Sequence, residues 1–98
     1  MANKTDKKTS GTSFYDVTFD ASVKQIIKIF GEPSYKDNCG NDKVNFEWDM
    51  ETIDGDVFTI YDWKEYRKLK LTEIVEWHIG ANSRSVSMQA LDEILELL

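Results

Sequence analysis

The residues with the greatest potential for chemistry lie between Phe58 and Arg84, where the sequence reads FTIYDWKEYRKLKLTEIVEWHIGANSR. This stretch contains two of the three tryptophans, two tyrosines and the only histidine of the chain. Aromatic rings can stack on a base, and an arginine can bind phosphate or carboxylate through two parallel hydrogen bonds. These residue types predict a binding surface for a small anionic or base-containing ligand, and they form no catalytic signature.

The end of this stretch, GANSRSVS at residues 80–87, combines small residues, hydroxyl groups and one arginine. A helix is expected to follow it. The free N–H groups and the positive dipole end of that helix would face an anion held by Arg84 and its polar neighbours. The alternative is a plain connection that ends in a serine N-cap, which is a common arrangement. The spacing matches neither a P-loop nor a GxGxxG motif, so both interpretations stay open.

Aromatic residues beside basic ones supply the rest of the expected site. Trp63 and Tyr66 lie where a strand is expected to end, next to Arg67, and they either stack on a base or pack on the sheet. His78 and Glu76 form a pair capable of acid–base chemistry, but no nucleophile motif accompanies them. We therefore predict a non-enzymatic binding protein with no cofactor. The expected ligand contacts are Trp63, Tyr66, Arg67, His78, Asn82, Ser83, Arg84 and Ser85.

Negative charge is concentrated in one segment. Residues 42–65 contain eight acidic and two basic side chains, so they hold the whole net charge of −6, and the rest of the chain is neutral. Duplex nucleic acid is an unsuitable partner, because phosphate binding needs a basic surface. A basic surface on another protein is the alternative partner, and a merely solvated sheet face is the plain explanation. The residues of this alternative interface are Glu47, Asp49, Glu51, Asp54 and Asp56.

The sequence indicates neither a metal site nor a membrane segment. The acidic segment lacks the spacing of an EF-hand loop, and one cysteine, Cys39, with one histidine cannot complete a zinc site. No apolar run approaches the roughly 18 residues of a membrane span. The first residues, MANKTDKKTSGTS, contain no apolar region of a secretory signal. A cytoplasmic location is the resulting expectation.

Two amphipathic helices and several strands must position these residues. Apolar side chains recur with helical spacing from Val23 to Phe30, after a potential N-cap at Asp20, and Gly31 ends this helix. A second helix, capped by one of three serines, is expected to bury Leu91, Ile94, Leu95 and Leu98. Strands are predicted at 14–19, 44–50, 57–63 and 74–79, with a loop at 35–41.

The strand details bear on which side chains face the core. Asp54-Gly55 predicts a type I′ hairpin between the second and third strands. In the last strand, Trp77 is expected to face the core and His78 the opposite side, and residues 80–82 are expected to break the strand. The order (β)-α-β-β-β-α predicts a single α+β domain at 13–98. Its mostly antiparallel sheet of three or four strands carries both helices on one face. Residues 1–12 are predicted to be a mobile tail.

Two resemblances accompany these patterns. The segment from Val23 to Trp63, a helix followed by GEPSY and a tryptophan-bearing hairpin, resembles the small α/β folds of the BamE-like and beta-lactamase-inhibitor-protein type, although the lipoprotein signal and its cysteine are missing. The phrases FTIYDWKEYR and EWHIGANS resemble those of small uncharacterised phage-encoded proteins. The second resemblance implies a viral accessory protein in the host cytoplasm. Such proteins are often inhibitors of host factors or of signalling nucleotides.

Together these observations give two hypotheses for the function. The first is a protein that binds or sequesters a phosphate-bearing nucleotide through the aromatic and arginine residues and a helix N-terminus. The second is an acidic inhibitor or adaptor that docks on a basic surface of a host protein through its 42–65 hairpin. Self-association into a homodimer or larger oligomer is a further expectation, because the second face of the sheet carries bulky side chains.

Overall fold

The computed structural model describes residues 2–98. Its two helices and its antiparallel sheet confirm the predicted α+β class in one small domain. The helices are α1 (Val23–Phe30) and α2 (Arg84–Leu97). The strands are β1 (Asn3–Lys4), β2 (Ser13–Ala21), β3 (Tyr35–Lys36), β4 (Phe46–Glu51), β5 (Val57–Tyr61) and β6 (Val75–Ala81).

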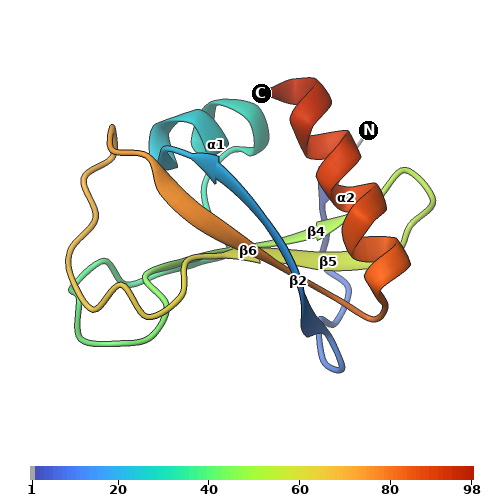
Figure 1. Ribbon diagram of the computed structural model, residues 1–98, viewed down its shortest axis with the longest axis horizontal. Helices are drawn as coiled ribbons and strands as arrows, with labels where there is room; N and C mark the ends of the chain where they lie inside the picture. The colour runs from blue at the N-terminus through green and yellow to red at the C-terminus, as the bar shows by residue number, and fades with distance from the viewer. Residues whose placement is uncertain (1) are drawn as a thin grey trace.

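The sheet has six strands in the order β1-β4-β5-β6-β2, and β3 also pairs with β4. Every pairing is antiparallel. The two strands beyond the predicted number are β1 and β3, which are two residues long and carry little pattern. The predicted loop at 35–41 therefore begins as a strand. Both helices cover the same face of the sheet, and the other face carries only loops and the N-terminal segment (Figure 1).

The caps of α1 follow from local chemistry. Ser22 accepts a hydrogen bond from the Gln25 backbone N–H, and the Gln25 side chain accepts from the Ser22 N–H, which is a capping box. The expectation of an N-cap at Asp20 is wrong, because Asp20 still belongs to β2 and pairs with Glu76. Gly31 ends the helix as predicted, and its φ of 84° is a conformation that glycine adopts without strain.

The β4–β5 hairpin forms at the predicted place with a different turn. Gly55 donates to the Thr52 carbonyl and has a φ of 84°, whereas Asp54 is not among the positive-φ residues. A type I′ turn needs positive φ at both central positions, so the predicted turn type is wrong. The three-residue loop with glycine at its end is instead the geometry of a type I turn followed by a bulge. It places β4 and β5 in register from Glu47↔Tyr61 to Glu51↔Val57.

The core lies between the sheet and the helices. It is built on Trp48 and Trp77, both fully buried, whose rings meet edge to face at 5.5 Å and 81°. Each indole N–H is satisfied, since Trp48 donates to the Gly31 carbonyl at 2.9 Å and Trp77 donates to the Ala21 carbonyl at 2.8 Å. The predicted core position of Trp77 is confirmed. The two tryptophans thus tie the sheet to both ends of α1.

Helix α2 buries part of the predicted stripe, since Ile94 is buried and Leu91 packs against the core. Its buried residues are Ser87, Ala90 and Ile94. Leu95 is 53% exposed and Leu98 is 43% exposed, so the expectation that both face the core is wrong. Small residues let the helix approach the strands closely, which the leucine spacing did not indicate. Among the three candidate caps the structure uses Ser83, whose Oγ accepts from the Val86 N–H.

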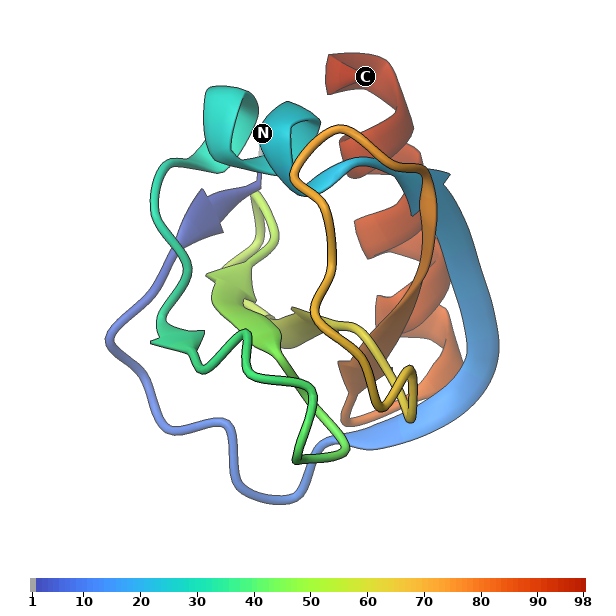
Figure 2. The same cartoon turned by 90° about the vertical axis from the view of Figure 1, so that its left-hand side faces the viewer.

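The N-terminal segment lies along the sheet and does not extend away from it. Ala2 is only 3% exposed, and Asn3 and Lys4 pair with the outer edge of β4. The Thr5 N–H then donates to the Asp49 carbonyl at 3.0 Å. Figure 2 shows the segment continuing around the sheet into β2. Composition does not reveal this backbone pairing of residues 3–5. The mobility predicted for residues 1–12 stays a prediction, and residue 1 lies outside the described residues.

Candidate functional site

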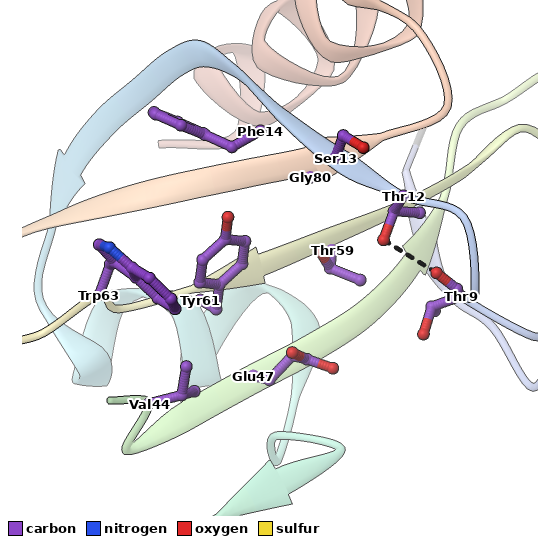
Figure 3. A pocket seen from close by; sticks show the side chains of 10 residues that line it. All are labelled: Thr9, Thr12, Ser13, Phe14, Val44, Glu47, Thr59, Tyr61, Trp63 and Gly80. Carbon is purple, nitrogen blue, oxygen red and sulfur yellow. Dashed lines mark hydrogen bonds between the residues drawn. The ribbon is translucent and has the colours of Figure 1, made fainter. Parts of the chain in front are cut away.

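The face of the sheet without helices contains a pocket, here called the outer-face pocket, with a volume of about 260 Å³. Side chains on β5 reach this face because they alternate with the buried Phe58 and Ile60. Segment 9–14 forms one wall, where Thr12 donates from Oγ1 to the Thr9 carbonyl at 2.8 Å. The lining residues are Thr9, Thr12, Ser13, Phe14, Val44, Glu47, Thr59, Tyr61, Trp63 and Gly80 (Figure 3).

Gly80 makes the floor of the outer-face pocket. A Cβ atom at this position would lie 2.7 Å from the Thr59 hydroxyl oxygen and 3.7 Å from that of Thr12. Only a glycine therefore lets the two hydroxyl groups converge over β6. The expectation that Gly80 and Ala81 break the last strand is wrong, because both belong to β6 and Gly80 pairs with Phe14 and Thr59.

Four aromatic rings form a continuous row along this face. Tyr61 and Trp63 meet edge to face, with centroids 6.1 Å apart. His78 stacks on Phe14 at 4.2 Å and 20°, and it also lies 5.6 Å from Tyr61. Such contacts fix ring orientations, and a fixed ring binds a planar ligand with little loss of conformational freedom.

His78 belongs to this row as a packing residue. Its position opposite Trp77 is confirmed, and the side chain is 16% exposed. Burial lowers the pKa of His78 below its usual value, against the opposing charge of Glu76 at 3.9 Å. Burial therefore disfavours the protonated imidazole, which makes His78 a weaker partner for a phosphate. Its contribution to the site is to support Phe14 and Tyr61.

Glu47 is the electrostatically unusual group of the outer-face pocket. Burial, a hydrogen bond with Asp49 and the charge of Asp49 raise the pKa of Glu47 to about 7. Asp49 lies two residues along the same face of β4, and its buried Oδ1 accepts from no donor among residues 2–98. Burial and the charge of Asp49 therefore make Glu47 bind a proton more readily than an exposed glutamate does. Burial and the Glu47 charge also raise the pKa of Tyr61.

Trp63 is positioned by its buried neighbour in sequence. Asp62 is fully buried, and its Oδ1 accepts from the backbone N–H groups of Asn45 and Phe46 at 2.9 and 2.8 Å. Burial raises the pKa of Asp62 against the lowering effect of these two donors. This link fastens the end of β5 to the start of β4. Trp63, which is 41% exposed, consequently leaves the sheet at a fixed point and forms the open wall of the pocket.

Positive charge lies at the Trp63 end of the outer-face pocket. The Nζ atoms of Lys64 and Lys43 lie 5.5 and 6.0 Å from the centroid of the Trp63 ring. The two residues are also joined by a backbone hydrogen bond of 2.7 Å, from Lys64 N–H to the Lys43 carbonyl. Both side chains are exposed and can move toward a bound anion.

The structure separates the predicted ligand contacts. Trp63 lines the outer-face pocket and His78 supports it, whereas the other six residues do not line it. Arg67 is paired with Glu73 at 2.7 Å, and Tyr66 is exposed in the same connection with a φ of 50°. These residues are close in sequence, so we predicted that they form one cluster. The chain instead leaves the sheet after Trp63 and joins it again only at β6.

The start of α2 uses its polar groups for internal contacts. Arg84 donates from Nη1 to the Tyr15 carbonyl at 3.0 Å, and the Tyr15 hydroxyl donates to the Asn82 carbonyl at 3.3 Å. Ser83 caps the helix, and Ser85 is exposed. The plain interpretation of this segment, a serine-capped connection, therefore describes its geometry. Its hydrogen bonds fasten α2 to β2.

The acidic residues of the alternative interface also have different surroundings. Glu47 and Asp49 are the neighbouring carboxyl groups of β4 described above, which are joined by a hydrogen bond. Glu51 pairs with Lys7 at 2.8 Å, and Asp54 accepts from the Gln89 side chain at 3.0 Å. Asp56 is exposed. The hairpin consequently presents less free negative charge than its composition indicates.

Three structural and comparative findings complete the description. No group of His, Cys, Asp and Glu within residues 2–98 has the arrangement of a metal site. Neither helix in that range is long and apolar enough to cross a membrane. The chain matches no protein-family model, and comparisons with curated proteins and with solved structures give no match either. The geometry of the site is therefore the basis for a functional proposal.

Proposed function

We propose that this protein is a non-enzymatic binding protein that holds the base of a phosphate-bearing nucleotide in the outer-face pocket. The observation that carries the proposal is Glu47, a half-buried carboxyl group with a pKa raised to about 7 inside a pocket walled by aromatic rings. A strongly perturbed titratable group in a hollow is a recognised sign of a binding or catalytic site.

The pocket offers a base both of the contacts it needs. Tyr61, Trp63 and Phe14 supply aromatic surface, and a stacked base gains about 1–3 kcal/mol on such a ring. The ionised carboxyl group of Glu47 accepts N–H donors of a base, and the Thr59 hydroxyl can donate or accept beside it. Figure 3 shows these polar and aromatic groups around the same hollow.

Size and charge fit a nucleotide whose phosphate stays outside. The volume of about 260 Å³ is below the roughly 300–1,000 Å³ of pockets for drug-sized ligands, which suits a base with part of its sugar. Lys43 and Lys64 place two positive charges at the Trp63 wall, where the phosphate would emerge. These lysines replace Arg84 as the proposed phosphate contacts.

Calorimetric titration with mono-, di- and cyclic nucleotides tests the proposal. We expect Trp63→Ala to weaken binding by about 1–3 kcal/mol, or roughly one to two decades in Kd. Tyr35→Ala is the matched control, because Tyr35 has the same 41% exposure and lies outside the pocket on β3. Arg84→Ala tests whether the nucleotide binds at the start of α2 or in the outer-face pocket. The substitution leaves the affinity unchanged if the base occupies the outer-face pocket. The absence of heat and of thermal shift with every nucleotide would overturn the proposal.

The docking hypothesis has less support. It needs a row of free carboxylates, and Glu51 and Asp54 already have partners within the chain. Asp49→Lys combined with Asp56→Lys remains its test, because reversal of two charges slows electrostatically steered association with a basic protein. An association rate that the double substitution leaves unchanged would remove this alternative.

A further inference from the structure

A second hollow, here called the lysine groove, lies at the sheet end where β3 meets the connection between β5 and β6. Its volume is about 810 Å³. Its apolar lining comes from Phe46, Leu69 and Leu71, of which only Leu71 is substantially exposed, at 51%. None of these residues lines the outer-face pocket. The groove is therefore a separate feature from the nucleotide site proposed above.

Three lysines surround this apolar lining. They are Lys36, Lys68 and Lys70, all exposed. No carboxylate among residues 2–98 lies within 4.0 Å of their ammonium groups, whereas Lys7 and Arg67 both have such partners. In a chain with a net charge of −6, three unpaired positive charges around one hollow are a local reversal of sign. The positive charges of the three lysines attract an anion to this place.

The walls of the lysine groove are held by backbone contacts. The Asn38 side chain both donates to the Leu69 carbonyl at 2.9 Å and accepts from the Leu69 N–H at 2.8 Å. A Cβ atom on Gly40 would lie 2.8 Å from the Arg67 backbone, so the two segments touch there. Figure 2 shows them running side by side. A groove with fixed walls needs little reorganisation on binding.

The far end of the connection is fixed as well. Glu73 accepts from the Lys70 N–H at 2.7 Å, and the Leu71 carbonyl accepts from the Lys24 N–H at 2.9 Å. These bonds set the direction of the chain between Lys68 and Leu71, so apolar and basic side chains alternate along the rim of one hollow. That alternation is the basis of the inference.

We propose that the lysine groove binds an anionic amphiphile, a molecule with an aliphatic body and an acidic head. The exposed side chain of Leu71 contacts the body above the buried Leu69 and Phe46, and the lysine ammonium groups hold the head. An aliphatic body is favoured over an aromatic one because the Phe46 ring is 1% exposed and offers no stacking face. Lysines act as point charges without a preferred fork geometry, so the head is a carboxylate or a phosphate.

Titration calorimetry with dodecanoate below its micelle concentration tests this site on the wild-type protein. Dodecanol and acetate, which each contain half of the ligand chemistry, should bind at least about tenfold more weakly. A comparison of dodecyl phosphate with dodecanoate shows whether the groove prefers a phosphate or a carboxylate head. Tight binding of either compound supports the site. Amide shifts in an NMR titration should concentrate at Leu69 and Leu71. Dodecanol that binds as tightly as dodecanoate, or no binding of dodecanoate at all, would overturn the proposal.

Charge and apolar variants with matched controls complete the test. Lys68→Glu with Lys70→Glu should weaken dodecanoate binding about tenfold, whereas Lys8→Glu with Lys28→Glu makes the same charge change away from the groove. Leu71→Ser should weaken binding, and Leu95→Ser is its control at 53% exposure on α2. Equal losses in a variant and its control would refute the site. Nucleotide binding should be unchanged in all four, so this proposal and the nucleotide proposal can fail separately.

Discussion

Replacement of Glu47 by glutamine should stabilise the protein above neutral pH and have little effect at about pH 5. Burial and the neighbouring Asp49 raise the pKa of Glu47 from 4.5 to about 7. The folded state therefore binds the proton more tightly than the unfolded state. The resulting stability is fully present below pH 4.5 and is lost as the pH rises through about 7. Glutamine resembles the protonated acid, and its amide can still donate to Asp49, so the variant escapes this loss.

The size of the effect follows from the shift. A change in pKa from 4.5 to about 7 corresponds to about 3 kcal/mol if the group were fully shielded from water. Glu47 is only half-buried, and solvent screens the repulsion from Asp49. A discounted value of about 1–2 kcal/mol is therefore expected for the gain of Glu47→Gln at about pH 8.5. Asp49→Asn should recover part of the same gain by removing the repelling charge.

Urea unfolding followed by fluorescence of the buried tryptophans measures this gain at about pH 5 and about pH 8.5. Glu96→Gln, which neutralises an exposed acid on α2, is the control and should shift stability equally at both pH values. The reasoning is refuted if Glu47→Gln differs from the wild type by the same amount at both values. A carboxyl resonance of Glu47 that titrates near pH 4.5 would refute it independently.

Three further predictions concern the framework of the site. Gly80→Ala should destabilise the protein by about 1–3 kcal/mol through collision with the Thr59 hydroxyl, and combining it with Thr59→Ala should restore most of that loss in a thermal melt. Ser22→Ala should lose about 1 kcal/mol of stability to urea, because it removes the cap of α1. Trp77→Ala should lose about 3–5 kcal/mol or prevent folding, and an unchanged melting curve would show that Trp77 is not a core residue.

Periodic segments of the sequence predicted the fold well. The alternation in β4, β5 and β6 and the helical spacing of α1 identified the central sheet and the first helix, because burial of one face leaves a repeat in the sequence. The prediction of the buried face of α2 was wrong where Ser87 and Ala90 contact the sheet, because such small residues add little to a hydrophobic repeat. Strands β1 and β3 were missed because two residues of backbone pairing leave no repeat.

The site was predicted less well, for a physical reason. Trp63 was identified, but its partners in the outer-face pocket come from β2, β4, β6 and the N-terminal segment, which only the tertiary fold brings together. Tyr61 could have been predicted from the sequence, because it lies two residues before Trp63 and alternate residues along a strand face the same side of the sheet. No local pattern indicates the paired role of Glu47, because its pKa depends on burial. The phage resemblance, the nucleotide ligand and the oligomeric state stay predictions.

The order of the strands has a consequence for synthesis of the chain. Strand β2 is completed early, yet its sheet partner is β6, with Ala21 opposite Val75 and Ser13 opposite Ala81. Until residue 81 has left the ribosome, Val17 and Phe19 have no strand to pair with and no closed core to enter. The β4–β5 hairpin can form alone, but closure of the sheet must wait for this long-range pairing. In the nascent chain, the apolar side chains of β2 therefore stay exposed until β6 is available for pairing.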